Sequence, residues 1–218
     1  MKSLLKVALI LFLLFASTFL LLNITGVLTA DQIEFWLTNA KDLPPIYIGL
    51  FVASLLFLDL FIAVPTLTIA IAAGYFLGHI YGFIAVFIGF SLAGVVGYCL
   101  SRLYGNKVLN FLIKDEDKRM EATTLFKKHG VVTILLSRAM PILPEVSACL
   151  AGMMHLPFKR FITAWILSSA PYALIATYAG SISTFDDPKP AIFAAIGLSV
   201  FLWTCWYLYR RAHRYSVN

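Results

Sequence analysis

Three charged side chains stand inside long apolar stretches of this sequence, where a charge is costly and therefore informative. Arg138 follows seven uncharged residues, and Asp59 and Glu145 are the acidic residues that interrupt apolar sequence. A guanidinium group can hold a phosphate or pair with a carboxylate, and a buried carboxyl group can carry a proton. Arg138 is therefore a candidate anion-binding residue. Two alternatives stay open: it neutralises Asp59 or Glu145, or it snorkels to the membrane surface.

Prolines interrupt the same two stretches of sequence. Proline has no N–H donor and breaks the helix around it. A helix that restarts after such a break directs free N–H groups into the space beside it, which suits an anion such as phosphate. The candidate substrate-binding residues are Arg138, Pro141, Pro144, Glu145, Asp59 and Pro65, and Asp59 and Glu145 are also candidates for proton coupling.

The chain contains no His/Cys cluster with metal-ligand spacing, no H-E-x-x-H motif and no G-x-S-x-G motif. We therefore expect no metal, no cofactor and no enzymatic activity. The three cysteines lie in apolar runs and predict no disulfide framework.

The composition shows where these elements must lie. Of 218 residues, 61% are hydrophobic and 13% are charged, and the mean hydropathy is +0.87. In soluble domains roughly half of the residues are hydrophobic and roughly a quarter are charged. The values of this chain therefore indicate an all-α integral membrane protein and argue against a nucleic-acid partner. Spanning helices are expected over Val7–Leu28, Gly82–Ser101, Phe161–Gly180 and Ala191–Tyr209. We expect the first to remain in place as an anchor, since Leu28 is a poor fit to a signal cleavage site.

The two proline-containing stretches, Ile46–Ile80 and Val131–Leu156, do not fit simple crossings. The arms of the second, Val131–Met140 and Glu145–Leu156, reach only about 15–18 Å each, roughly half of the hydrocarbon core. We predict two re-entrant helical hairpins that enclose a cavity, because broken backbone at membrane depth must be buried in protein or line such a space.

The basic residues support this arrangement. We place the N-terminus on the cytoplasmic side and let both hairpins return to the side they entered. All of the 17 basic residues except Lys41, Lys189 and Arg138 then fall on the cytoplasmic side, as the positive-inside rule predicts. Both termini and the charged connection 106–129 are then cytoplasmic. Within that connection, Asp115 is expected to cap a helix that runs to Gly130 and lies on the membrane surface.

The chain also shows an internal repeat. An offset of 78 residues aligns Gly74 with Gly152 and Ser91 with Ser169, and each half consists of a hairpin followed by a span. This order is typical of an inverted-topology repeat, which places its binding site near the bilayer midplane. Spacings of four between Gly74, Gly78 and Gly82 predict close helix approach.

These features resemble the DedA/VTT-domain (SNARE-associated Golgi protein) family. The second half of its pattern is similar to the run SRAMPILPE from Ser137 to Glu145, followed by Ala151–Gly152, Leu156–Phe158 and Ala179–Gly180. The first half is similar to the series Asp59, Pro65, Ala73–Gly78 and Gly82. The chain departs from the pattern at Pro144, where many DedA proteins have a second arginine, and at Asp59, where a glutamate is usual.

The resemblance implies a core over residues 44–180, an N-terminal helix and external loop over 1–43, and a C-terminal helix and basic tail over 181–218. It also implies translocation of a phosphate-bearing lipid, such as a polyprenyl phosphate or a phospholipid, with proton coupling left open. The alternative is a proton-coupled exporter of a small solute or cation. The expected partners are membrane lipids, with protons as a candidate coupling ion. The expected location is a bacterial cytoplasmic membrane, and an organelle membrane is the alternative that the sequence leaves open. The sequence leaves the oligomeric state open.

Overall fold

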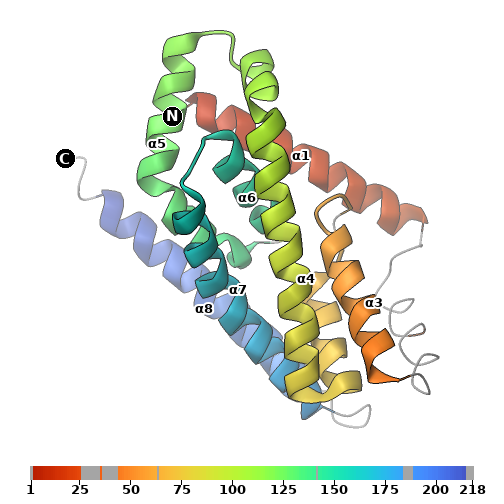
Figure 1. The fold of residues 1–218 in the computed structure, drawn as a ribbon. Coiled ribbons are helices and arrows are strands. Elements are labelled where there is room, and N and C mark those ends of the chain that lie inside the picture. Colours follow the sequence, from red (N-terminus) through yellow and green to blue (C-terminus); the bar gives the residue numbers. More distant parts are fainter. Residues whose placement is uncertain are drawn as a thin grey trace.

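The structure is a computed structural model that describes residues 2–25, 35, 44–62, 64–140, 142–183 and 189–214. Its regular elements are helices, shown in Figure 1. Their bounds are α1 Lys2–Thr25, α3 Pro45–Leu58, α4 Thr66–Leu112, α5 Glu116–Leu135, a 3₁₀ helix Ser137–Ala139, α6 Leu143–Met153, α7 Phe158–Ser181 and α8 Lys189–Arg214.

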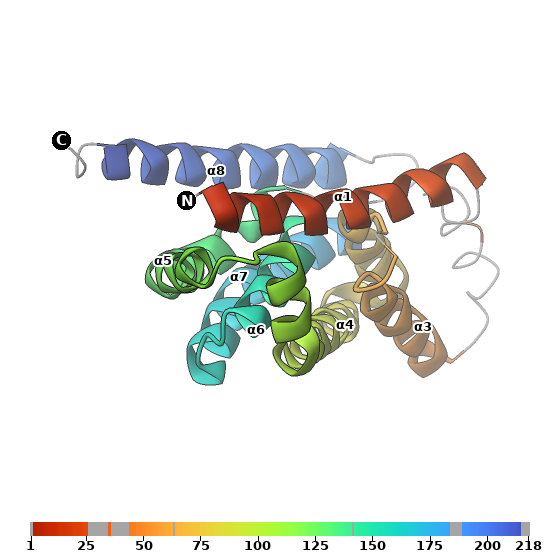
Figure 2. The same ribbon diagram turned by 90° about the horizontal axis from the view of Figure 1, so that it is seen from above.

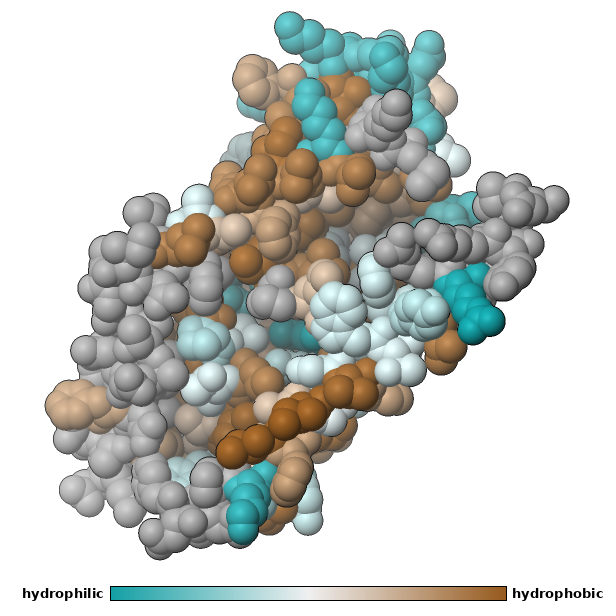
Figure 3. All heavy atoms as spheres, turned by 180° about the vertical axis from the view of Figure 1, so that it is seen from behind, coloured by the Kyte–Doolittle hydropathy of each residue, from teal (hydrophilic) through white to brown (hydrophobic). Residues whose placement is uncertain are grey.

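In the described part of the chain, α4, α7 and α8 each contain a segment long and apolar enough to cross a membrane. Large hydrophobic side chains are exposed on the outer surface, including Leu103 at 73% and Phe193 at 68%. Hydrophilic residues gather at the end of the molecule where α4 meets α5 (Figure 3). An apolar outer surface of this kind requires lipid rather than water around it. The chain is an integral membrane protein.

The predicted helix breaks are present at both proline positions. α3 ends at Leu58, and the Asp59 carboxylate accepts a hydrogen bond of 2.9 Å from the backbone N–H of Val64 before α4 begins at Thr66. In the second half, α5 ends at Leu135 and α6 begins at Leu143. Pro141 lies outside the described residues.

The helix α5 differs from the prediction at its C-terminal end. Asp115 is the N-cap, as expected: its side chain accepts hydrogen bonds from the backbone N–H groups of Asp117 and Lys118. Hydrogen bonding from the Lys118 side chain lowers the pKa of Asp115. The prediction that the helix stops at Gly130 is wrong, because the helix continues to Leu135 and Gly130 packs in its interior against Phe126. The expected arm from Val131 is thus the last turns of α5.

Gly78 has a different role from the predicted one. It adopts φ 75° and ψ 173° inside α4, a conformation that is essentially restricted to glycine. The chain reverses there, so that residues 66–77 and 79–112 are two arms, and Gly82 lies against the backbone of Ala73. The chain reverses again between α6 and α7 at His155, which has φ 52°. Of Gly74, Gly78 and Gly82, only the first and last allow another backbone segment to approach closely, since nothing lies within 4 Å of an added Cβ at Gly78.

The core has two parts, one around each broken stretch. The first joins α1, α5 and α6 to the C-terminal half of α4 and the start of α7, and includes Tyr98, Phe126 and Phe161. The second joins α3 and the N-terminal half of α4 to the later turns of α7, and includes Leu56 and Phe90. α3 and α6 lie toward opposite ends of the molecule (Figure 1). α4 and α7, which contribute to both parts, connect the two halves.

Helices α1 and α8 form a layer on one face of this core (Figure 2). The middle of α8 lines a cavity together with the core helices. The face that carries this layer is hollowed near its centre, where hydrophilic residues are visible among largely apolar ones (Figure 3). The two helix breaks therefore lie beneath α8.

Candidate functional site

A cavity of about 360 Å³ lies where the two broken stretches meet. Its wall is formed by the turn after α3, the first turn of α4, the 3₁₀ helix and the start of α6, with side chains from α7 and α8 closing it. Five of the six predicted substrate-binding residues line it: Asp59, Pro65, Arg138, Pro144 and Glu145. The structure thus brings together residues 86 positions apart in the chain, from Asp59 to Glu145.

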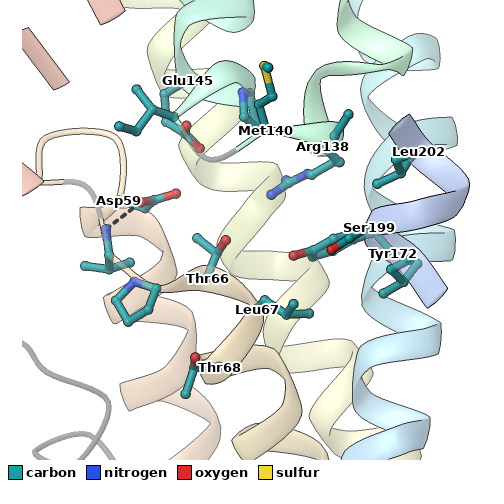
Figure 4. A pocket seen from close by; sticks show the side chains of 16 residues that line it. Asp59, Thr66, Leu67, Thr68, Arg138, Met140, Glu145, Tyr172, Ser199 and Leu202 are labelled. Carbon is teal, nitrogen blue, oxygen red and sulfur yellow. Dashed lines mark hydrogen bonds between the residues drawn. The ribbon is translucent and has the colours of Figure 1, made fainter. Parts of the chain in front are cut away.

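The charged side chains converge on this cavity (Figure 4). Asp59, Arg138 and Glu145 are buried, with 4%, 9% and 7% of their surfaces exposed. The Asp59 carboxyl comes from the end of α3 and the Glu145 carboxyl from the first turn of α6. The two carboxyl groups lie within reach of a shared hydrogen bond. Two neighbouring carboxylates repel each other, and the pair is therefore a candidate site for a coupling cation such as a proton.

Arg138 has partners that the sequence analysis did not anticipate. Its Nη2 donates a hydrogen bond of 3.1 Å to the hydroxyl group of Ser169 on α7. Its guanidinium carbon lies 3.8 Å from the centroid of the Phe90 ring, which places the charge over an aromatic face. Asp59 and Glu145 act on it electrostatically, yet neither forms a salt bridge with it among the described side chains. The guanidinium points into the cavity (Figure 4).

Two helix N-termini also border the cavity. Thr66 begins α4 and Leu143 begins α6, and residues of both first turns line the wall. Neither N-cap residue, Pro65 or Ile142, provides a side-chain hydrogen bond to the helix. The first N–H groups of a helix have no intrahelical partner, and the helix dipole adds positive potential there. The N–H groups of Thr66 and Leu143 donate to the carbonyl oxygens of Val64 and Met140, and Pro144 has no N–H. The cavity therefore combines a guanidinium group with helix N-termini whose remaining donors lie mainly in the first turn of α4, and both features favour an anion.

Sequence reasoning missed the residues that surround Arg138. Trp165, Ser169 and Tyr172 lie on one face of α7, at positions i, i+4 and i+7. This spacing was visible in the sequence, but only the structure shows that the face meets Arg138. Ser199 and Leu202 on α8, which also line the cavity, had no recognisable signal.

Elsewhere in the described part of the chain, two histidines have structural contacts. His155 Nε2 lies 3.0 Å from the Asn106 side-chain oxygen, and His79 Nδ1 lies 3.4 Å from the Thr177 hydroxyl group. Within the described ranges, no group of three or more His, Cys, Asp or Glu residues could hold a metal ion.

Comparison with known proteins identifies relatives for much of the chain. The VTT domain model matches residues 64–182. Protein DedA of Escherichia coli K12 is 30% identical over 96 residues, which cover 41% of this chain and 44% of that protein. The uncharacterized protein MJ0201 of Methanocaldococcus jannaschii is 32% identical over 138 residues, 62% of this chain and 82% of that protein. Undecaprenyl phosphate transporter A of Bacillus subtilis is 26% identical over 160 residues, 69% of this chain and 75% of that protein.

The match to E. coli DedA thus spans less than half of that relative's length. No solved structure gives a significant match.

Proposed function

Because the chain belongs to the VTT domain (DedA) family of membrane proteins, we propose that it translocates a phosphate-bearing lipid between the leaflets of a membrane. The substrate would be a polyprenyl phosphate or a phospholipid, with its phosphate in the cavity and its acyl or prenyl tail in the bilayer. The name of the B. subtilis relative, which specifies an undecaprenyl phosphate transporter, supports a lipid phosphate as substrate.

The observation that carries the proposal is the charge arrangement around the cavity. Inserting an arginine at the centre of a membrane costs about 2.5–3.5 kcal/mol on insertion scales. We therefore expect a buried arginine either to have a functional role or to be neutralised by an acidic partner. No carboxylate of the described residues forms a salt bridge with Arg138, and its guanidinium points into the cavity. The first turn of α4 adds N–H donors at the same place. Together they suit a phosphate group.

The same proposal includes the membrane arrangement of the chain. The pair α3 with residues 66–77, and the end of α5 with α6, would be re-entrant hairpins that enter from opposite sides. Two reciprocal contacts support an inverted repeat: Gly74 lies against the backbone of Thr177 on α7, and Gly152 against the backbone of Tyr98 on α4. These are the two glycines that the 78-residue offset aligns.

The proposed orientation places both termini in the cytoplasm of a bacterial cell. Lys6 from α1 lines one recess together with Lys114 and Lys118, which follow α4. Basic residues from separate parts of the chain thus gather at one end, as the positive-inside rule requires of a cytoplasmic surface. The name of a further relative, the inner membrane protein YohD of E. coli, supports the cytoplasmic membrane as the location.

A second candidate function is proton-coupled export of a small solute or cation. The contact between the Asp59 and Glu145 carboxyl groups favours it, because a pair that shares a proton can release it to one side and bind it from the other. The same pair could couple protons to lipid movement.

Reconstitution in liposomes tests the proposal and separates the candidates. Movement of a fluorescent phosphate-bearing lipid between leaflets would be measured alongside solute efflux and proton flux. Arg138→Ala should abolish lipid movement, and Arg138→Lys should retain part of it, because lysine keeps the charge but loses the planar fork. Arg160→Ala, which removes an exposed arginine on α7, is the matched control and should behave like wild type.

Two results would contradict this assignment. Wild-type lipid movement in Arg138→Ala would exclude Arg138 as the phosphate site. Recovery of movement when Arg138→Ala is combined with Asp59→Asn or Glu145→Gln would make Arg138 a structural counter-ion, since an unpaired buried charge costs more than none. Solute or proton flux without lipid movement would favour the export function instead.

A further inference from the structure

Aromatic rings from two helices surround the Arg138 side chain. Besides the Phe90 ring at 3.8 Å, the rings of Trp165 and Tyr172 each have their centroids 5.4 Å from the guanidinium carbon. Phe90 and Trp165 are 1% and 2% exposed, so these faces are removed from the surrounding lipid and water. The quadrupole of an aromatic ring attracts a cation that lies over its face, and more strongly when both partners are desolvated.

These rings are held in place by contacts that do not involve Arg138. The indole N–H of Trp165 donates a hydrogen bond of 3.0 Å to the backbone carbonyl of Phe90, which ties α7 to α4 at this level. Gly94, one turn further along α4, lies directly against the Trp165 ring, where a side chain would collide with it. The aromatic faces are therefore fixed before any ligand enters.

The rings and a carboxylate would hold an arginine in different ways. A carboxylate occupies the N–H edge of the guanidinium group and must be displaced by an incoming phosphate. A ring contacts the flat face and leaves the edge available. Among the described side chains, the Ser169 hydroxyl group accepts a hydrogen bond from Arg138. This bond occupies one of the five N–H donors of the guanidinium group.

We propose that Phe90, Trp165 and Tyr172 are positioning residues that hold the Arg138 guanidinium by its face, so that its N–H edge stays available for the phosphate of the lipid. The inference rests on the proposed function and extends it from the binding residue to the residues that orient it. Phe90 makes the closest contact and should have the largest effect.

Equilibrium binding of dioctanoyl phosphatidic acid to the purified full chain in detergent tests this inference. Phe90→Leu removes the ring face while keeping a buried apolar side chain, and should raise the dissociation constant about fivefold or more. Phe126→Leu is the matched control: Phe126 is 2% exposed, lies on α5 away from the cavity, and should leave the dissociation constant unchanged. Thermal unfolding of each variant would show that the protein is folded when binding is measured.

Tyr172 provides a second pair of variants, on the cavity wall. Tyr172→Phe keeps the ring and should bind more tightly than Tyr172→Leu, which removes it. A purely structural role would lower the fraction of folded protein in both leucine variants without changing the dissociation constant of the remainder. Weaker binding in Phe90→Leu and Tyr172→Leu, together with rescue by phenylalanine at Tyr172, would support the inference.

The failures of the two proposals are distinguishable. If wild type binds and Arg138→Ala does not, the phosphate site stands, and wild-type affinity in Phe90→Leu and Tyr172→Leu would overturn the positioning role alone. If binding does not depend on Arg138, either because wild type fails to bind or because Arg138→Ala binds equally, the phosphate site is wrong and this inference falls with it.

Discussion

The same substitution, glycine to alanine, should change stability in opposite directions at two helical positions. At Gly74 an added Cβ would overlap the carbonyl oxygen of Thr177 and lie 2.7 Å from its Cα, so the backbones of α4 and α7 would have to separate. At Gly197, in α8, nothing lies within 4 Å of the added atom. Gly78 provides a third case: the space is open, but its backbone conformation is one that L-residues rarely adopt.

The magnitudes follow from these surroundings. Alanine is better than glycine in a helix interior by about 1 kcal/mol, so Gly197→Ala should stabilise the protein by up to that amount. Overpacking costs about 1–3 kcal/mol or more when backbone must move, so Gly74→Ala should be net destabilising by about 2 kcal/mol. Gly78→Ala should cost about 1–3 kcal/mol through backbone strain alone.

Equilibrium unfolding of the purified variants in mixed micelles would measure these changes. Gly152→Ala should resemble Gly74→Ala, since its added Cβ would overlap the carbonyl oxygen of Tyr98 and lie 2.9 Å from the backbone nitrogen of Arg102. Equal stability of Gly74→Ala and Gly197→Ala would refute the close contact between α4 and α7, and with it the reciprocal glycine contacts that support the repeat.

Three further outcomes follow from the site and the proposed topology. Pro144→Ala should reduce lipid movement more than Pro171→Ala, because Pro144 lines the cavity in the first turn of α6 whereas Pro171 lies on the exposed side of α7. Liposome assays at matched protein levels compare the two variants. Equal effects would show that the helix break at Pro144 is incidental. Glu145→Gln should weaken any dependence of transport on a pH gradient, because the amide retains hydrogen bonding but cannot release a proton. An unchanged dependence would exclude Glu145 as the residue that carries the proton. The topology can be tested with Lys127→Cys and Lys189→Cys, each in a background without other cysteines. Membrane-impermeant reagents should label the first variant only from the cytoplasm and the second only from outside. Labelling of both variants from the same side would contradict the topology.

The sequence predicted the helix breaks because proline has a conformational effect that surroundings rarely override. α3 ends shortly before Pro65 and α6 starts beside Pro144, close to the expected positions. Glycine is less specific: Gly74 and Gly78 have the same spacing pattern, yet one packs against a helix and the other reverses the chain. Gly130 was expected to end a helix and lies inside one. Which role a glycine takes depends on tertiary neighbours that spacing does not specify.

The candidate site was predictable in its residues but not in its contacts. Charges at membrane depth must converge or be neutralised, and Asp59, Arg138 and Glu145 do line one cavity. Their pairing was left open, and the structure places the two acids against each other and the arginine against aromatic rings. The aromatic and hydroxyl contacts of Arg138 depend on how α7 is rotated about its axis, because this rotation brings Trp165 and Ser169 to the guanidinium group. Hydrophobic periodicity cannot specify that rotation when a helix is apolar on most faces.

The separation of the acid pair from the arginine has a consequence for the proposed mechanism. If Arg138 were paired with Glu145, phosphate binding and proton release would compete for one group. In this cavity the positive group and the acid pair are distinct but close enough to interact electrostatically. A phosphate beside Arg138 would repel negative charge on Asp59 and Glu145. By linkage, any proton that the acid pair binds would favour phosphate binding, and phosphate binding would favour that proton to the same extent. Lipid and proton would then bind together without sharing a ligand.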